Sequence, residues 1–267
     1  MEASTSLKLI DEICKEKGID EKILSFGFIR ELKKNGKICH IVDEAFDLNP
    51  AGSFLIVNDK YACFEVLENN GVNSLKHYMI FNPEGRMKNV PKIDEEVDKA
   101  IEKYGTKLVV KANDSSEGQE VYLVNGRQEA ISKIEDIFSR HFLSLSICPF
   151  EEIEAEYRVI CLDGEILCLY KKIAKGWKHN LSQGAKIVVD VENDDKIDEV
   201  KDLALRAFKA VNARFVSVDI SKKSNGEIFV MEINGSVCMN KFIENAPNGK
   251  EIAKKVYGKA LDKMFNH

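Results

Sequence analysis

The chain reads Phe215-Val-Ser-Val-Asp-Ile-Ser221, then Ser224-Asn-Gly-Glu227, then Glu227-Ile-Phe-Val-Met-Glu-Ile-Asn234. The first and last stretches are typical of β-strands, and the Asn-Gly pair between them is a strong hairpin signal. A two-residue Asn-Gly loop fixes the register and places Asp219 directly opposite Glu232. Because like charges opposite each other destabilise a sheet face, this pairing needs a physical reason.

A bound cation between the two carboxylates is one such reason. Asn234 stands two residues beyond Glu232 and adds an amide oxygen to the same face. Two carboxylates and an amide oxygen suit a hard cation such as magnesium. The alternative is an exposed acidic face neutralised by nearby lysines, which the hairpin alone does not exclude. The opposite face is predicted to join the core through Val216, Val218, Ile220, Met231 and Ile233.

The composition is that of an ordinary soluble globular protein, with 267 residues of which 44% are hydrophobic and 31% charged. The net charge of −5 gives no electrostatic reason to expect binding to nucleic acid or to an anionic membrane. No apolar run approaches the roughly 20 residues that span a bilayer, and the amino terminus lacks a signal pattern. Seven scattered cysteines without C-x-x-C spacing favour a reducing cytoplasm.

The first third of the chain alternates helical and strand patterns. Helical spacing predicts helices over residues 7–17 and 21–34, each followed by a glycine. Short strands are expected over 38–42 and 54–57. Asn58-Asp59 supplies an N-cap for a helix that ends before the next glycine.

A second hairpin is predicted in the middle of the chain, with strands over 157–162 and 165–170 around an Asp-Gly turn. Its register places Glu156 opposite Lys171, with Arg158 on the same face. The pair can equally be a cross-strand ion pair worth under about 1 kcal/mol. The other predicted elements are helices over 94–104, 128–140, 196–211 and 249–265 and strands over 108–112, 121–124 and 143–148.

Lys111 is the next informative residue, because it lies inside an otherwise apolar strand. A buried ammonium costs free energy unless it reaches an anion or water, although a lysine can also extend to the sheet edge. The polar, glycine-containing segment 113–119 that follows could donate backbone N–H groups to phosphates. Neither a Walker A loop nor G-x-G-x-x-G occurs in the chain, so a bound nucleotide would be held by a different scheme.

Taken in order, these pieces resemble the ATP-grasp superfamily. Four motifs are most similar to the RimK-type and glutathione-synthetase-like branch of this superfamily. They are Glu156-Tyr-Arg158, Asn180-Leu-Ser-Gln-Gly184, Val218-Asp-Ile220 and Met231-Glu-Ile-Asn-Gly235. The resemblance covers roughly residues 55 to 262. No single motif is specific, but their order and the two hairpins make a strong set.

The resemblance implies an α+β fold, an α/β sandwich in which two α+β subdomains clasp a nucleotide. Residues 1–56 would form a short N-terminal α/β region ahead of the ATP-grasp part. Residues 57–148 would form the central or lid subdomain, and residues 149–267 the C-terminal subdomain with the metal site.

The resemblance also implies the residues that bind ATP. Lys60 and Lys111 would contact its phosphates, and the loop that contains Ser116 and Gly118 would close over them. The strand 146–150 would hold the adenine. The family's usual acidic and aromatic hinge residues appear here as Cys148 and Pro149, and proline has no N–H to donate. The hinge contacts are therefore assigned to Cys148 and Phe150.

The remaining implied roles fall on the two hairpins and the segment between them. Glu156 would hold the ribose or adenine end, while Arg158 and Lys172 would act at the transferring phosphate. Lys171 and Lys178 would be further phosphate-side cations, and Asn180 would lie at the metal–phosphate site. Asp219, Glu232 and Asn234 would bind magnesium, two ions in all, for which manganese can substitute.

The implied function is an ATP-dependent carboxylate–amine ligase that forms an amide through an acyl phosphate. An ATP-grasp kinase and a non-catalytic ATP-binding protein are the alternatives. The segment Gly235-Ser-Val-Cys-Met-Asn240 lacks the Pro-Gly of many relatives, so the identity of the acceptor is not inherited. The region ahead of Lys60 is short for the family's first domain. That is consistent with a trimmed substrate domain, with a homodimer that completes the site, or with a peptide or carrier-borne carboxylate in place of a small molecule.

Overall fold

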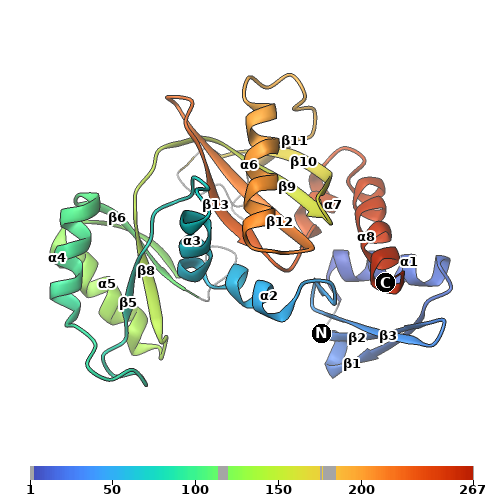
Figure 1. Cartoon of the computed structure of the whole chain (residues 1–267), viewed down its shortest axis with the longest axis horizontal. Helices are drawn as coiled ribbons and strands as arrows, with labels where there is room; N and C mark the ends of the chain where they lie inside the picture. The colour runs from blue at the N-terminus through green and yellow to red at the C-terminus, as the bar shows by residue number, and fades with distance from the viewer. Residues whose placement is uncertain (1–2, 114–119, 175, 177–184, 267) are drawn as a thin grey trace.

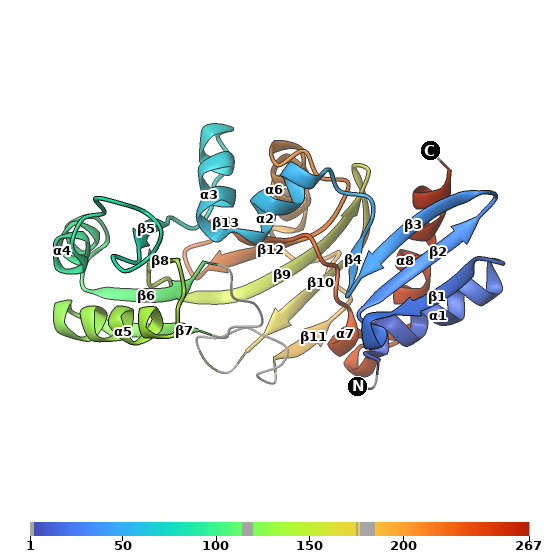
Figure 2. The same cartoon turned by 90° about the horizontal axis from the view of Figure 1, so that it is seen from below.

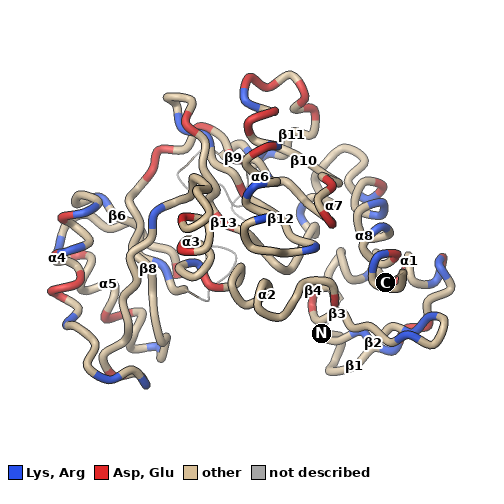
Figure 3. Tube along the Cα trace, in the orientation of Figure 1, with Lys and Arg blue, Asp and Glu red and all other residues tan. Residues whose placement is uncertain are grey.

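The computed structural model describes residues 3–113, 120–174, 176 and 185–266. Its strands form three sheets, flanked by helices and arranged along the long axis of the molecule (Figures 1 and 2). Strand pairs within all three sheets are antiparallel, so the expected α+β class is confirmed. Basic and acidic residues are interspersed along the whole trace (Figure 3).

The N-terminal region consists of α1 (Thr5–Glu16) and a four-stranded sheet in the order β1-β2-β3-β4. Its strands are β1 (Asp20–Leu24), β2 (Ile29–Lys34), β3 (Lys37–Val42) and β4 (Ala45–Phe46). The predicted strand over 38–42 is confirmed, but the predicted helix over 21–34 is wrong.

A hairpin replaces that helix because the backbone turns at residues 25–27, where Gly27 has φ +96°. Beyond the turn, burial along β2 follows the two-residue period of a strand: Arg30 and Leu32 are buried, whereas Ile29, Glu31 and Lys33 beside them are not. The helical spacing of the apolar residues was therefore accidental.

The next segment holds α2 (Ala51–Asn58) and α3 (Lys60–Asn69). The predicted strand over 54–57 is wrong, because a short apolar run does not distinguish a strand from a buried helix. The predicted N-cap of the following helix is confirmed: the Asp59 carboxylate accepts a hydrogen bond of 2.8 Å from the Ala62 N–H.

A second sheet in the order β5-β8-β6-β7 occupies the middle of the chain. Helices α4 (Ile93–Tyr104) and α5 (Arg127–Ser139) pack against each other and share a core with this sheet. The strands are β5 (Tyr78–Phe81), β6 (Lys107–Ala112), β7 (Val121–Asn125) and β8 (Ser144–Pro149). The helices predicted over 94–104 and 128–140 and the strands predicted over 108–112, 121–124 and 143–148 are thus confirmed within one or two residues.

The third sheet has the order β11-β10-β9-β12-β13, with α6 (Ile197–Ala210) packed on one face. Its strands are β9 (Ile153–Leu162), β10 (Glu165–Ile173), β11 (Lys186–Val188), β12 (Phe215–Lys223) and β13 (Ile228–Asn234). Both predicted hairpins are present here, as β9–β10 and β12–β13.

In the β12–β13 hairpin, Asp219 pairs with Glu232 as predicted. The predicted two-residue loop is wrong: the Lys223 N–H donates to the Glu227 carbonyl, which leaves three residues in the turn. Gly226 adopts φ +85°, the left-handed position that such a three-residue loop requires. A register shift just beyond Asp219 compensates for the extra turn residue and restores the carboxylate pairing.

The β9–β10 hairpin also contains a register shift, between Ile166 and Cys168. As a result Glu156 faces Lys172, whereas the sequence predicted Lys171. Because successive side chains on a strand point to opposite faces, this one-residue difference moves Lys171 to the other side of the sheet.

The N-terminal region shares one hydrophobic core with the end of the chain. Apolar side chains of α1 and of the first sheet pack against α8 (Gly249–Phe265), α7 (Asn240–Asn245) and the near ends of β9 and β12. The helices predicted over 7–17, 196–211 and 249–265 are confirmed. Of the helices in the described parts of the chain, none combines the length and the apolar character needed to cross a bilayer.

Candidate active site

A cluster of buried ionic side chains lies on one face of the third sheet. The Arg158 guanidinium on β9 donates two hydrogen bonds, of 2.8 and 2.6 Å, to the Asp219 carboxylate on β12. The Lys172 ammonium on β10 lies 3.2 Å from Asp219 and also forms an ion pair with Glu156. The Asp219 and Lys172 side chains are only 2% and 3% exposed. The charges of these four residues therefore interact with one another in an environment that contains little water.

Burial and the neighbouring charges shift the pKa values of Asp219 and Glu156 in opposite directions. Burial by itself would raise the pKa of Asp219, but Arg158 and Lys172 hold that pKa well below its usual range, so Asp219 stays ionised. Burial raises the pKa of Glu156 to about 7, with Lys172 opposing the rise and Asp219 adding to it. Glu156 therefore titrates close to neutral pH.

Glu232 and Asn234 on β13 lie beside this cluster. The Asn234 amide donates to a Glu232 carboxylate oxygen at 3.3 Å, so the two side chains are adjacent on the same face. Within the described residues, Glu232 forms no ion pair with a lysine or arginine, and no group of three or more His, Cys, Asp or Glu side chains could hold a metal ion. The sequence-predicted ligands Asp219, Glu232 and Asn234 nevertheless lie together on this face, and two carboxylates with an amide oxygen are hard donors that suit magnesium. In this structure Arg158 donates hydrogen bonds to both Asp219 carboxylate oxygens.

Two lysines from different elements lie near each other on the side of the middle sheet. Lys111 on β6 is 7% exposed and has no carboxylate partner among the described residues. Lys60 begins α3. Burial lowers the pKa of the His77 imidazole well below its usual value, and the charges of Lys111 and Lys60 lower it further. Both ammonium groups are thus close enough to lower the pKa of the same buried imidazole. Two neighbouring positive charges of this kind form a candidate anion-binding site.

The predicted hinge residues connect the middle and third sheets. Cys148 at the end of β8 is fully buried, and its sulfur lies 3.4 Å from Nδ1 of His77. The N–H of Phe150 donates to the Lys107 carbonyl, and the Lys107 ammonium lies 3.8 Å from the centre of the Phe150 ring.

A small apolar cluster spans this junction and consists of Leu75, Cys148 and Phe229, with Ile153 and Met231 against it. Met231 thus packs here, beside the register shift of β13, and not in the core wall where the sequence placed it.

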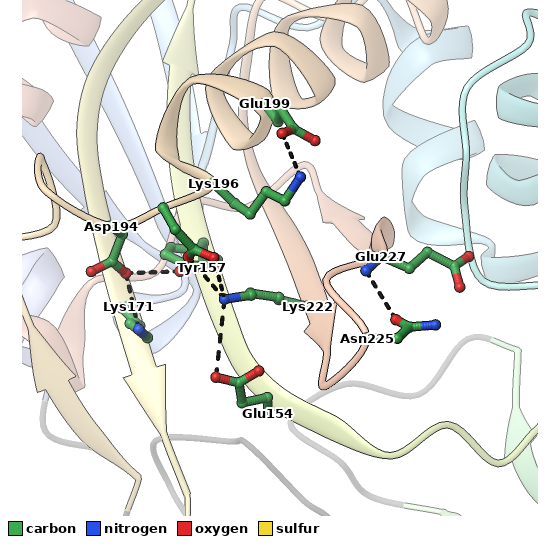
Figure 4. A network of polar contacts seen from close by, with 10 residues as sticks. Glu154, Tyr157, Lys171, Asp194, Lys196, Glu199, Lys222, Asn225 and Glu227 are labelled. Carbon is green, nitrogen blue, oxygen red and sulfur yellow. Dashed lines mark hydrogen bonds and ion pairs between the residues drawn. The ribbon is translucent and has the colours of Figure 1, made fainter.

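Lys171 lies away from this site. Its ammonium pairs with Asp194 at 2.9 Å, and the same carboxylate accepts a 2.8 Å hydrogen bond from the Tyr157 hydroxyl (Figure 4). Lys222 on β12 pairs in turn with Asp195. These contacts attach the segment before α6 to the opposite face of the sheet from Asp219.

The structure thus brings Glu156, Arg158, Lys172, Asp219, Glu232 and Asn234 onto one face of the third sheet, and Lys60, Lys111, Cys148 and Phe150 to the middle sheet and its junction. Ser116, Gly118, Lys178 and Asn180 lie outside the described residues. Sequence reasoning missed His77 and Asn113, both buried beside the lysines. The only signal for Asn113 was its place as the first residue of the polar segment 113–119, which gave its side chain no role of its own.

Comparisons with known proteins show the family and the fold of the chain. The model of the protein family called the RimK-like ATP-grasp domain matches residues 57–258 of this chain. The chain therefore belongs to the RimK-like ATP-grasp family.

Among individual proteins, the chain is 25% identical over 218 residues to the coenzyme gamma-F420-2:alpha-L-glutamate ligase of Methanocaldococcus jannaschii, covering 80% of this chain and 67% of the ligase. It is 24% identical over 194 residues to a probable alpha-L-glutamate ligase of Haemophilus influenzae, covering 72% of this chain but only 60% of that protein.

Among solved structures, the D-alanine–D-alanine ligase from Bacillus anthracis superposes with a TM-score of 0.62 at 21% identity, covering 82% of this chain and 69% of the ligase. Its complex with ATP superposes with a TM-score of 0.60 at 22% identity, covering 82% and 68%. At these identities the likeness shows the fold, which is the ATP-grasp fold.

Proposed function

We propose that this protein is an ATP-dependent carboxylate–amine ligase, which forms an amide bond and releases ADP and phosphate. The proposal rests on one arrangement. Asp219 and Glu232 face each other on the third sheet, and Lys60 and Lys111 both lie close to the buried His77 ring beside the middle sheet. Family membership supports ATP as the phosphoryl donor. The relatives named above are ligases, which favours this reaction over the kinase and over a non-catalytic ATP-binding protein.

The chemistry follows from the poor reactivity of a carboxylate at neutral pH. Transfer of the ATP γ-phosphoryl group to the carboxylate oxygen gives an acyl phosphate and ADP. An amine then attacks the acyl carbon, phosphate leaves with the electrons of the broken C–O bond, and the amine loses a proton. Such transfer depends on positioning and charge neutralisation more than on covalent help from the protein.

The residues of the site supply that neutralisation. Lys60 and Lys111 would bind phosphate oxygens from the side of the middle sheet, while Arg158 and Lys172 would act from the third sheet. Asp219, Glu232 and Asn234 would hold magnesium. When bound, this ion would neutralise phosphate charge and orient the transferring group. Arg158 already bonds Asp219, so this guanidinium stands next to the ligand that would carry the metal.

The nucleotide base would lie against the apolar cluster at the junction, where Cys148 and Met231 pack, with Phe150 two residues after Cys148 and Glu156 on β9. In this arrangement residues 57–148 act as the central or lid part, residues 149–267 carry the metal, and residues 1–56 precede them. We also propose a cytoplasmic location, because all seven cysteines are free thiols.

The relatives' names make L-glutamate the first amine to test. The carboxylate partner is a small molecule, a peptide or a carrier-borne group, and a homodimer is one way to complete its site. A pool of carboxylic acids should be offered with L-glutamate, ATP and magnesium, and phosphate release measured. We expect release that needs both acid and amine.

Lys111→Ala is expected to weaken ATP binding about tenfold or more, because it removes a buried charge-assisted contact. Calorimetric titration with a non-hydrolysable ATP analogue measures this, with Lys99→Ala, an exposed lysine of α4, as the control. An unchanged affinity of Lys111→Ala would remove this lysine from the site. A phosphorylated alcohol formed without any amine would instead identify a kinase.

A further inference from the structure

Asn113 connects three elements at the point where β6 ends. Its side-chain NH2 donates to the Asp59 carboxylate at 2.8 Å. Its side-chain oxygen accepts hydrogen bonds from the Ser146 hydroxyl at 2.8 Å and from the Tyr61 N–H at 3.2 Å. The residue is only 2% exposed, so these bonds are made away from water. One amide group thus joins β6, β8 and the first turn of α3.

The same network reaches Lys60. The Asp59 oxygen that receives Asn113 also caps α3 through the Ala62 N–H at 2.8 Å. Lys60 is the first residue of that helix, and its ammonium donates to the Asn113 backbone carbonyl at 3.3 Å. The start of α3, and with it the base of the Lys60 side chain, is therefore attached to β6 through Asn113.

Lys111 stands two residues before Asn113 on the same strand. The two lysines come from separate elements, and their like charges repel in a poorly hydrated environment. A fixed separation between them needs a rigid connection, and a fully satisfied buried polar network supplies rigidity of this kind.

We propose that Asn113 is a positioning residue that sets the distance between Lys60 and Lys111, so that both ammonium groups reach one phosphate chain. The inference rests on the proposed nucleotide site and extends it to a residue that need not touch the nucleotide. It predicts that loss of the Asn113 amide weakens the binding of phosphate groups specifically, beyond any loss of stability.

Asn82 offers a matched control. It is also a buried asparagine with three side-chain hydrogen bonds, to the carbonyls of Phe138 and Phe142 and from the N–H of Glu84. It follows β5 in the same part of the chain, and its side-chain hydrogen bonds go to Phe138, Phe142 and Glu84. Asn82→Ala therefore removes a comparable network without disturbing the lysines.

The experiment is calorimetric titration of the whole protein with ADP and with adenosine, in magnesium buffer. We expect Asn113→Ala to weaken ADP binding about tenfold, consistent with about 1.4 kcal/mol, and to change adenosine binding less than about twofold. Asn82→Ala should leave both affinities unchanged while lowering the melting temperature to a similar extent. In a Lys60→Ala background, Asn113→Ala should cause less than about a threefold further loss of ADP affinity, because Asn113 is proposed to act by positioning Lys60.

If Asn113→Ala does not fold, Asp59→Ala tests the same idea, since it removes the carboxylate that accepts the Asn113 NH2 group and caps α3. It should weaken ADP binding about threefold and spare adenosine. Equal losses for ADP and adenosine, or fully additive losses in the double variant, would overturn the inference. So would an Asn113→Ala protein with normal ADP affinity when Lys60→Ala weakens ADP. A wild-type protein that binds neither ligand would instead overturn the proposed function itself.

Discussion

Glu44 is a buried carboxylate far from the ionic cluster, between β3 and the segment that follows Asn234. It accepts hydrogen bonds from the Ser4 hydroxyl at 2.8 Å and from the Asn240 amide at 3.3 Å. Burial, followed by a hydrogen bond with Asp43, raises its pKa to about 7, while the Ser4 hydrogen bond acts in the lowering direction. The folded protein therefore holds a proton here at pH values where the unfolded chain has lost it.

This difference makes stability depend on pH. The stabilising contribution of protonated Glu44 is fully present below pH 4.5, the value for the unfolded chain, and is lost as the pH rises through about 7. Glu44→Gln keeps a neutral acceptor, so it should match the wild type near pH 4 and be more stable by on the order of 3 kcal/mol at pH 8. Urea unfolding at both pH values measures this, with Glu102→Gln on the exposed side of α4 as the control. A constant difference between Glu44→Gln and the wild type would contradict the prediction.

The strands of the third sheet make the two candidate metal ligands unequal in a mutational test. Asp219 is the buried counter-ion of Arg158 and Lys172, so Asp219→Asn leaves two buried cations without sufficient negative charge. Breaking a buried ion pair in this way costs about 3–5 kcal/mol. Glu232 is only half-buried and contacts Asn234, so its neutralisation should disturb the fold little.

We therefore expect Glu232→Gln to lose magnesium-dependent binding of an ATP analogue while its unfolding free energy changes by about 0.5 kcal/mol or less. Asp219→Asn should lose both this binding and several kcal/mol of stability. Calorimetric titration with and without magnesium, beside urea unfolding of each variant, separates the two effects. Retained magnesium dependence in Glu232→Gln would remove this residue from the metal ligands.

We expect the first and third sheets not to unfold independently, because they share a core with α1, α7 and α8. The Tyr257 hydroxyl on α8 donates to the Ser6 hydroxyl on α1 at 2.9 Å, or to the Val237 carbonyl at the same distance. Leu9, Ile10 and Ile13 of α1 are fully or almost fully buried in the same cluster. Residues outside the family match thus complete the packing of the segment that follows Asn234.

A chain that begins at residue 50 lacks α1 and the first sheet, and it would expose the apolar side chains of α8. Each such side chain is worth about 1.5–3 kcal/mol when buried. We expect the shortened chain to melt at a much lower temperature than the whole protein, or without a cooperative transition, in circular dichroism. The full chain should unfold in one transition. A shortened chain with an unchanged melting temperature would show that the first sheet is an independent unit.

Much of the site was predictable from local patterns. The opposed carboxylates Asp219 and Glu232 followed from a hairpin signal and from alternation along the strands, and the cap at Asp59 followed from residue chemistry. Family resemblance supplied Lys60 and Lys111, and the comparisons confirmed the fold. These features depend on residues close together in the sequence, so the sequence contains their signals.

The sequence by itself thus determined the ATP-grasp fold, most helices and the facing carboxylates. Only the tertiary structure decided that residues 21–34 form a hairpin, that Lys172 and not Lys171 meets Glu156, and that Arg158 neutralises Asp219. Register shifts and buried ion pairs depend on which strands become neighbours and on how much water they exclude. Those quantities are set by packing between distant parts of the chain, and a local pattern does not contain them.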